Sequence, residues 1–221
     1  RAEKQIVAAA GVDAPSQMAA GVYRGLLQAE RDRARVFAGK ARPHFLRPVP
    51  PGVEKTLAAL GRISEGDLAG ARKLLDEAEE ERPALAGRRG ESPFEDLRDF
   101  DDRIGGVVEM VFQGKYTWFP LEYARSLEPN APKKLRDLIW PGARITADDG
   151  TSADVFLFAL YPGSSEHEDD LVKLGRMTDW KNLAEDLQAG LGLRSILVDG
   201  EDVSLFELGP IELEEREPLP S

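Results

Sequence analysis

The stretch from Phe100 to Pro120 constrains the fold most, because its hydrophobic period changes in the middle. Its first part has apolar residues at helical spacing, which predicts a helix over residues 101–113. Its second part, residues 116–119, is an aromatic run that predicts a β-strand closed by Pro120. Gly114 can supply the left-handed conformation that ends a helix. We therefore expect a helix followed directly by a strand, at the join between two unlike parts of the chain.

The residues before this stretch have the pattern of a helical protein. The longest predicted helix covers residues 18–38, and Gly39 ends it. A proline-rich segment, residues 41–51, then excludes regular helix and favours an extended connector. Two shorter helices follow at residues 53–63 and 67–82, the second with Asp67 as its N-cap. Together the two shorter helices predict an αα-hairpin.

Two segments, one at the start of the chain and one in the second of the shorter helices, share one spacing of small and apolar residues, and each is followed by a proline. The segments are Ala2, Ile6, Ala9 and Pro15, and Ala71, Leu75, Ala78 and Pro83. This spacing is typical of the second helix of a tetratricopeptide-type repeat, in which small residues let helices approach closely. The first copy lacks a partner helix, so we expect further residues before Arg1 in the natural chain.

The residues after the central stretch carry hairpin signals. Residues 143–147 and 152–161 flank Asp148-Asp149-Gly150, and residues 195–198 and 203–208 flank residues 199–202. Because the strand at 152–161 is apolar on both faces, we expect it to be central and covered. A short strand or turn is predicted at residues 171–180, and a helix at 182–189 ended by Gly190.

The predicted fold class is α+β, with tetratricopeptide-like helical hairpins followed by a compact mixed α/β domain with antiparallel strands. We place a helical, repeat-like domain at residues 1–88, the mixed α/β domain at 89–213 and an acidic tail at 214–221. The boundary falls in residues 86–93, where two glycines and a proline interrupt the periodicity.

Charge is unevenly distributed along the 221 residues, whose formal net charge is −11. Residues 1–90 carry 16 lysines and arginines against 12 acidic residues, whereas residues 91–221 carry 13 against 28. The acidic second part makes nucleic acid an unsuitable partner, because phosphate binding needs clustered cations. The basic excess of the first part has two interpretations, a solvated helix face or a docking patch for an acidic partner. Its members are Arg31, Arg33, Arg35, Lys40, Arg42 and Arg47.

Composition also limits the cellular location of the protein and the kinds of reactive site that it can contain. The chain has no cysteine, which excludes disulfides, a thiol nucleophile and cysteine-ligated zinc and agrees with a cytoplasmic location. Its sequence contains no apolar run of the roughly 20 residues that a membrane-spanning helix needs. We therefore predict no membrane partner. The sequence also has no P-loop and no G-x-G-x-x-G motif, so we predict no cofactor.

Two groups of residues could carry catalysis or bind a metal. His167 lies in G-S-S-E-H-E-D-D, which offers a serine, a histidine and carboxylates, but it lacks the spacing of a nucleophile elbow or a defined metal site. Asp102 and Glu109 would share one side of the predicted helix and could form a carboxylate pair. The alternative is structural: Asp101 or Asp102 caps that helix, and Arg103 pairs with a neighbouring acid.

Several aromatic residues could form either the core or a peptide groove: Tyr116, Trp118, Phe119, Trp140 and Trp180. Because aromatic residues in strands are more often core, the groove is the less favoured interpretation.

Several motifs in one order resemble the ImpE family, also called TagJ, whose members are accessory proteins of bacterial type VI secretion systems. The motifs are V-Y-R-G-L-L-Q-A-E-R-D-R-A-R-V-F-A-G-K at residues 22–40, D-D-R-I-G-G-V-V-E at 101–109, G-K-Y-T-W-F-P at 114–120, L-R-D-L-I-W at 135–140, Y-P-G-S at 161–164 and L-G-R-M-T-D-W at 174–180. Compared with the family pattern, the helices before Ala2 are missing and the acidic tail after Leu213 is unusual.

This resemblance implies a non-enzymatic cytoplasmic adaptor. Such an adaptor would bind a terminal helix of the small subunit of the contractile sheath and link it to the ClpV-type AAA+ ATPase that disassembles the sheath. A groove in the helical part would suit a helical partner, and we assign it the residues Tyr23, Leu26, Leu27, Arg31, Arg35, Tyr116 and Trp118. The alternatives are a generic tetratricopeptide-like peptide-binding module and a carboxylate-dependent hydrolase that uses Asp101, Asp102, Glu109 or His167.

Overall fold

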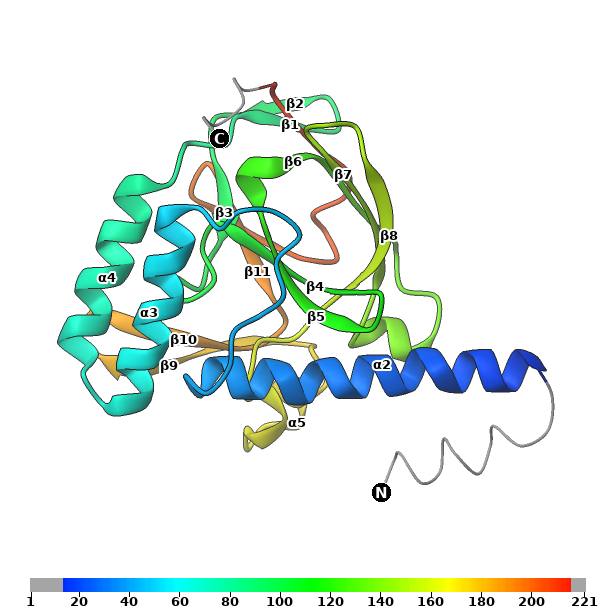
Figure 1. The fold of residues 1–221 in the computed structure, drawn as a ribbon, viewed down its shortest axis with the longest axis horizontal. Coiled ribbons are helices and arrows are strands. Elements are labelled where there is room, and N and C mark those ends of the chain that lie inside the picture. Colours follow the sequence, from blue (N-terminus) through cyan, green and yellow to red (C-terminus); the bar gives the residue numbers. More distant parts are fainter. Residues whose placement is uncertain (1–13, 216–221) are drawn as a thin grey trace.

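A computed structural model of the chain describes residues 14–215, with side chains from residue 17 onward. Figure 1 shows helices to the left of a group of curved strands and a long helix that runs beneath it. The helices are α2 (Ala14–Phe37), α3 (Pro51–Glu65), α4 (Leu68–Glu81), η1 (Leu121–Tyr123), η2 (Leu135–Leu138), η3 (Ser164–Glu166) and α5 (Asp170–Lys173). The strands are β1 (Gly87–Arg89), β2 (Ser92–Phe94), β3 (Leu97–Asp99), β4 (Val107–Phe112), β5 (Lys115–Pro120), β6 (Ala124–Pro129), β7 (Gly142–Ala147), β8 (Ser152–Leu157), β9 (Thr178–Ala184), β10 (Leu187–Gly192), β11 (Ser195–Val198), β12 (Glu201–Ser204) and β13 (Ile211–Leu213).

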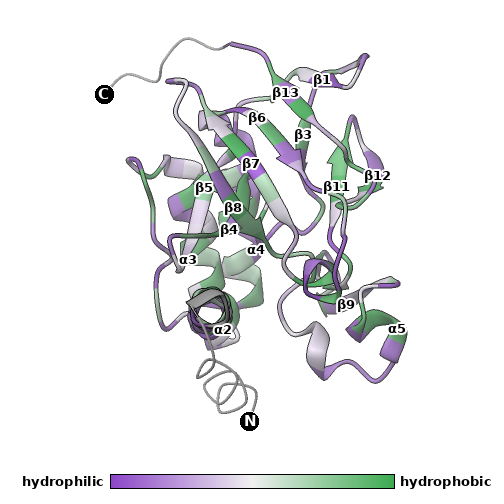
Figure 2. Cartoon of the chain, turned by 90° about the vertical axis from the view of Figure 1, so that its right-hand side faces the viewer, coloured by the Kyte–Doolittle hydropathy of each residue, from purple (hydrophilic) through white to green (hydrophobic). Residues whose placement is uncertain are grey.

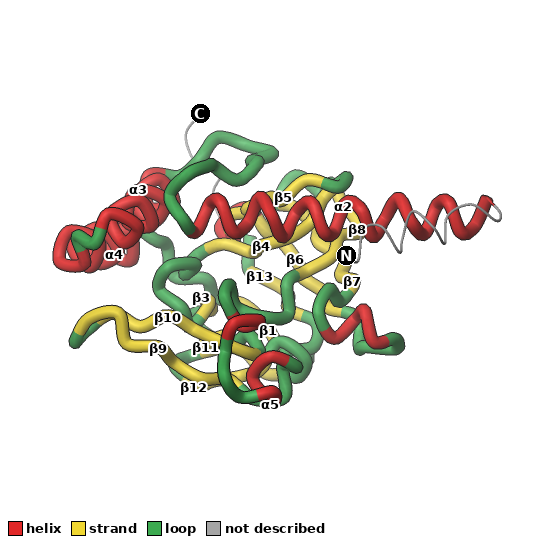
Figure 3. The backbone as a smooth tube through the Cα atoms, turned by 90° about the horizontal axis from the view of Figure 1, so that it is seen from below, coloured by secondary structure: helices red, strands yellow, loops and turns green. Residues whose placement is uncertain are grey.

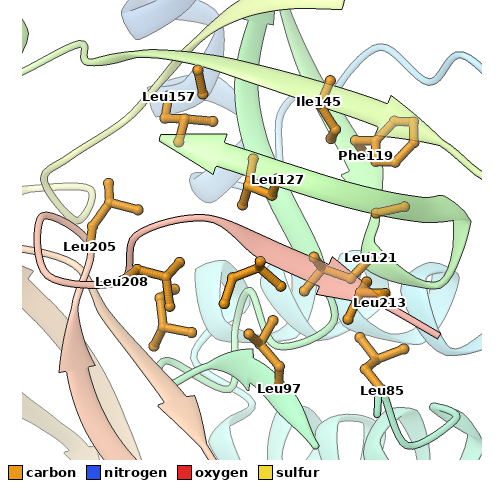
Figure 4. Packing of buried hydrophobic residues seen from close by; sticks show 14 of the residues in the cluster. Leu85, Leu97, Phe119, Leu121, Leu127, Ile145, Leu157, Leu205, Leu208 and Leu213 are labelled. Carbon is orange, nitrogen blue, oxygen red and sulfur yellow. The ribbon is translucent and has the colours of Figure 1, made fainter. Parts of the chain in front are cut away.

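The strands form three antiparallel units. The largest is an eight-stranded sheet in the order β2-β1-β13-β6-β7-β8-β4-β5. A three-stranded sheet, β12-β11-β3, and the hairpin β9-β10 complete the set. The main hydrophobic cluster lies between the two larger sheets, and Figure 4 shows side chains of both, such as Leu127 and Leu97, within it. The helices plus antiparallel sheets confirm the predicted α+β class.

The helical elements follow their local signals. Asp67 caps α4, because its carboxylate accepts a hydrogen bond from the backbone N–H of Gly70 at 3.0 Å. Gly66, with φ of 81°, ends α3 in the left-handed conformation. Helices α3 and α4 also pack against each other, which confirms the predicted αα-hairpin. Helix α2 lies against β4 and β5, and Figure 2 shows it end-on beneath these strands.

The two hairpins that turn residues predicted are also present. β7 and β8 pair across Asp148-Asp149-Gly150, and β8 is central because it lies between β7 and β4. β11 and β12 pair across a turn in which both Asp199 and Gly200 have positive φ. The second strand of this hairpin ends at Ser204 rather than Leu208.

The predicted helix over residues 101–113 is wrong. Residues 101–106 form a turn in which Gly105 has φ of 50°, and β4 then pairs with both β5 and β8. Gly114 does not end a helix: Gln113 and Gly114 have φ of 50° and 77°, which is the backbone of a two-residue type I′ hairpin. The spacing of the valines fits a helix and a doubly covered strand equally, and pairing with two neighbouring strands decided between them.

The predicted helix at residues 182–189 is wrong as well, because this segment belongs to the hairpin β9-β10. Leu187 is fully buried among Ala59, Ala71 and Leu75 of the αα-hairpin, so a tertiary contact stabilises the strand. Residues 171–180, predicted as a strand or turn, begin with the end of the short helix α5 and continue as a turn and the first residues of β9.

The tetratricopeptide-like interpretation stays a prediction. The first copy of the repeat, at Ala2, Ile6 and Ala9, lies outside the described residues. The second copy is the buried face of α4, where Ala71 and Leu75 are almost fully covered. Within residues 14–215, the helices are too short or too polar to cross a membrane.

Candidate functional site

Six charged side chains meet in the interior, which we call the buried charge cluster. Its members are Arg33, Asp99, Asp101, Arg103, Glu109 and Arg194, and each is at most 8% exposed. They come from α2, β3, the turn after β3, β4 and the segment before β11. Three arginines face three carboxylates, so the formal charges balance, as burial of charge requires.

Glu109 is the centre of this cluster. Arg33 donates to its two carboxylate oxygens from Nε and Nη2, each at 2.8 Å. Arg194 and the hydroxyl of Tyr116 also donate to the same carboxylate. Burial opposes ionisation, but the guanidinium groups of Arg33 and Arg194 outweigh it and hold the pKa of Glu109 at about 2. Glu109 is therefore ionised at neutral pH and attaches α2 to β4.

Asp99 has a different balance of forces. Arg194 donates to it from Nη1 at 2.5 Å, and the hydroxyl of Tyr161 donates at 2.9 Å. Burial nevertheless raises the pKa of Asp99 to about 6, and the nearby carboxylate of Asp101 acts in the same direction. Arg194 therefore joins two carboxylates of opposite pKa shift.

Asp101 organises the turn after β3. Its carboxylate accepts from Arg103 Nη2 at 2.5 Å and from the backbone N–H of Arg103 at 3.0 Å. It also accepts from the backbone N–H of Gly190 in β10 at 2.9 Å. The predicted pairing of Arg103 with a neighbouring acid is confirmed, but the carboxylate stabilises a turn and not a helix N-terminus.

The cluster lacks the geometry of the hydrolase hypothesis. Asp102 does not pair with Glu109, because Asp102 bonds Arg72 at 2.6 Å and Arg98 at 2.8 Å on a separate, more exposed site. Glu109 has no exposed side-chain surface for a substrate to reach. His167 bonds Asp179 at 3.0 Å on the surface. In residues 14–215, no three side chains of His, Asp or Glu are placed to hold a metal ion, and this includes the acidic loop 166–170.

A second candidate site lies on the surface, where η2 approaches the N-terminal half of α2. The guanidinium of Arg136 lies 5.9 Å from the ring centroid of Tyr23, and Trp140 Nε1 donates to Glu30 at 2.9 Å. Four apolar side chains around this contact are exposed: Met18, Val22, Leu135 and Ile139. We call these four residues the α2–η2 surface.

The comparison with protein families identifies the chain. Residues 91–212 match the family described as ImpE protein. The chain belongs to the ImpE family. A curated relative, the type VI secretion system accessory component TagJ of Pseudomonas aeruginosa, is 35% identical over 216 residues, which cover 97% of this chain and 75% of that protein. The crystal structure of protein VPA1032 from Vibrio parahaemolyticus has 25% identity and a TM-score of 0.89, covering 98% of this chain and 81% of that one.

The structure separates the seven residues predicted to bind a partner of this ImpE-family protein into two groups. Leu26, Tyr116 and Trp118 are buried, and the Trp118 Nε1 donates to the Tyr116 hydroxyl at 2.6 Å. Tyr23 and Leu27 are partly exposed, whereas Arg31 and Arg35 are exposed. The core interpretation of the strand aromatics is thus confirmed for Tyr116 and Trp118, and only the α2 residues with exposed surface can contact a partner directly.

Sequence reasoning missed the contribution of η2 to this surface. The signal was present in L-R-D-L-I-W at residues 135–140, a strongly apolar segment too short to bury all of its side chains. Its position beside α2 could not be predicted, because the two elements are more than 100 residues apart and meet only through tertiary contacts.

A cavity of about 430 Å³ lies elsewhere, between the αα-hairpin and the turn after β3. Apolar side chains such as Val53 and Leu75 line it together with Arg82 and Arg98. Both arginines are already paired, Arg82 with Asp96 and Arg98 with Asp102. The cavity therefore offers no unpaired cation to a ligand.

Proposed function

We propose that this protein is a non-enzymatic accessory component of a bacterial type VI secretion system that acts in the cytoplasm. The observation that carries the proposal is the 35% identity to TagJ, a named accessory component of that system, over 97% of this chain. The match covers the helical part and the β-rich part alike. In the interior Asp101 pairs with Arg103 and Glu109 pairs with Arg33, which supports a structural role for two of the carboxylates that the hydrolase hypothesis uses.

The specific role that we propose is that of an adaptor. It would bind a terminal helix of the small sheath subunit and link it to the ClpV-type ATPase. The tetratricopeptide-like interpretation of residues 1–88 belongs to this proposal, since stacked helices offer a face on which a short helix can lie. Tyr23, Leu27, Arg31 and Arg35 are the predicted residues of α2 that a partner could reach.

A calorimetric titration tests the adaptor role. The full chain would be titrated with the terminal-helix peptide of the small sheath subunit from the same genome, and we expect a dissociation constant of about 1 µM, typical of a transient helix-in-groove contact. A scrambled peptide of the same composition is the control. Absence of binding by a folded sample would reject the sheath subunit as the partner.

A variant separates the adaptor from the hydrolase alternative. Asp102→Asn removes the surface carboxylate that bonds Arg72 and Arg98. If the protein is an adaptor, this variant binds the sheath peptide as the wild type does. Loss of a hydrolytic activity in Asp102→Asn with intact peptide binding would favour the enzyme instead.

A further inference from the structure

The exposed end of α2 continues the buried face of the same helix. The buried face consists of Leu26, Ala29, Arg33 and Val36, at the three- and four-residue spacing of one helical stripe. Val22 and Met18 extend this stripe in four-residue steps toward the N-terminus, where they are 37% and 76% exposed. Figures 1 and 3 show why: the N-terminal half of α2 runs past the edge of the sheets. The apolar stripe therefore continues to Val22 and Met18 beyond the sheets, although Ala20 between them in the sequence is buried.

Residues 135–139, which include η2, add exposed apolar side chains next to the residues that contact α2. Leu135 is 85% exposed and Ile139 is 40% exposed, although both are large hydrophobic residues. The contacts of Arg136 with Tyr23 and of Trp140 with Glu30 hold residues 136–140 against the middle of α2. The α2–η2 surface thus joins apolar residues from two distant segments, which marks an interaction site more strongly than single exposed residues do.

The charges around the α2–η2 surface are basic, although the whole chain has a net charge of −11. Lys133 and Lys134 are exposed immediately before η2, and Arg24 is exposed on α2. A fourth cation, Lys115, is the first residue of β5 and follows the β4–β5 turn. This turn lies close to α2, since a Cβ added to Gly25 of α2 would lie 3.2 Å from the Cα of Gly114 in the turn.

None of these four cations has an ion-pair partner among residues 17–215. The nearby carboxylates are already in use, because Glu30 accepts from Trp140 and Asp137 accepts from Arg136 and two backbone N–H groups. The local field therefore favours a partner that brings its own carboxylates.

We propose that the α2–η2 surface binds an amphipathic helix of a partner protein, with apolar residues every three or four positions and carboxylates along its flanks. This inference rests on the proposed adaptor function and names the surface and the chemistry of the partner. A helix fits because apolar residues at three- and four-residue spacing on a partner helix can pack along exposed apolar residues that are four positions apart on α2. A second copy of this chain fits poorly, because pairing the same surface with itself would bring the four cations together.

A pair of designed peptides tests the chemistry of the surface on the full chain. Both peptides carry leucine at positions i, i+3, i+4 and i+7, and the remaining positions are glutamate in one and lysine in the other. Fluorescence anisotropy should show at least about tenfold tighter binding of the glutamate peptide, and high salt should weaken that binding. Equal binding of the two peptides, or binding of neither, would overturn the proposal.

Variants locate the binding to this surface. Met18→Ser/Val22→Ser removes exposed apolar groups, and Lys133→Glu/Lys134→Glu reverses the local charge; each should weaken binding of the glutamate peptide by about tenfold. Leu174→Ser and Lys181→Glu are matched controls, because both residues are exposed and belong to α5's C-terminal end and to β9, outside the α2–η2 surface. Circular dichroism verifies the fold of each variant. Unchanged binding by Met18→Ser/Val22→Ser would exclude the α2–η2 surface.

The same variants, titrated with the small sheath subunit, separate this inference from the adaptor role. If the wild type and both double variants bind the subunit equally, the adaptor role stands and this surface is wrong. If the wild type binds the glutamate peptide through the surface but not the subunit, the surface stands and the sheath partner is wrong. A concentration-dependent dimer that Met18→Ser/Val22→Ser abolishes would assign the surface to a second copy and overturn the proposal.

Discussion

At the scale of single residues, the most consequential feature is a charged side chain on the buried face of α2. Arg33 occupies a position in the stripe where its neighbours are apolar, and it remains buried because Glu109 accepts two hydrogen bonds from it. Burial of an ion pair contributes little net stability compared with apolar residues of similar size, but loss of one partner leaves an uncompensated charge. The pair therefore specifies how α2 sits on the sheet more than it stabilises the protein.

We expect Glu109→Gln to lower the free energy of unfolding by about 3–5 kcal/mol, because Arg33 and Arg194 both lose their common counter-charge. The double variant Arg33→Met/Glu109→Leu should recover most of this loss, since the unpaired Arg33 is removed and Arg194 keeps its pair with Asp99. Urea denaturation of the three proteins measures both values.

Glu54→Gln is the control, since the Arg42–Glu54 pair is exposed and should contribute less than about 1 kcal/mol. A double variant as unstable as Glu109→Gln would contradict this account of the pair.

Protonation of Glu109 at low pH should lower the stability of the protein. The pKa of Glu109 is lowered to about 2 from an ordinary value of 4.5. A lowered pKa in the folded state means that the stabilisation is present above pH 4.5 and is lost as the pH falls toward 2. The loss should amount to about 3 kcal/mol, from about 1.4 kcal/mol per pKa unit. Urea titrations between pH 5 and pH 2 should show a steeper decline for the wild type than for Glu109→Gln; parallel declines would contradict the assignment.

At the scale of elements, glycine has opposite roles in a strand and in a helix of this chain. Gly190 lies in β10 against the ring of Tyr161, and an added Cβ would lie 2.6 Å from two ring atoms. Gly61 lies in α3 with no atom within 4 Å of an added Cβ. The first glycine is required by a close approach, whereas the second only weakens a helix.

The same substitution at these two positions should therefore have opposite effects. Gly190→Ala should lower the free energy of unfolding by about 2 kcal/mol or more, because the Tyr161 ring and its bond to Asp99 must shift. Gly61→Ala should raise it by about 0.5–1 kcal/mol through helix propensity. Thermal or urea denaturation measures the change in the free energy of unfolding for both variants. A Gly190→Ala protein as stable as the wild type would show that the Tyr161 ring can move freely.

At the scale of the whole molecule, hydrophobic contacts cross the predicted boundary at residue 88. One cluster contains Leu26 and Val36 of α2 together with Val111 and Trp118 of the β4–β5 hairpin. The Arg33–Glu109 pair crosses the same boundary. The division at residue 88 therefore marks a change of secondary structure, and the two sides share one part of their core.

The full chain should consequently unfold in a single cooperative transition, with tryptophan fluorescence and far-UV circular dichroism changing at the same urea concentration. Residues 89–213 expressed alone should lose near-UV circular dichroism, because Trp118 would be exposed and Glu109 would lack Arg33. Two separate transitions of the full chain, or a natively folded 89–213 segment, would show that the parts are independent domains.

The sequence by itself determined those features whose signals are local. The N-cap Asp67 and the glycine at the end of α3 act within one helical turn, and the Asp148-Asp149-Gly150 turn acts within one hairpin. These elements were predicted correctly because their cause lies in adjacent residues. The family membership was likewise predicted from motifs that follow one another along the chain.

Only the tertiary structure decided the elements and contacts that depend on distant partners. Residues 107–112 fit a helix or a strand, and pairing with β5 and β8 selected the strand. Glu109 is 76 residues from Arg33 and 85 from Arg194, so no local pattern could predict the buried charge cluster. The α2–η2 surface was missed for the same reason. Capping and turn formation are short-range interactions, whereas strand pairing, charge burial and surface assembly form only when the whole chain has folded.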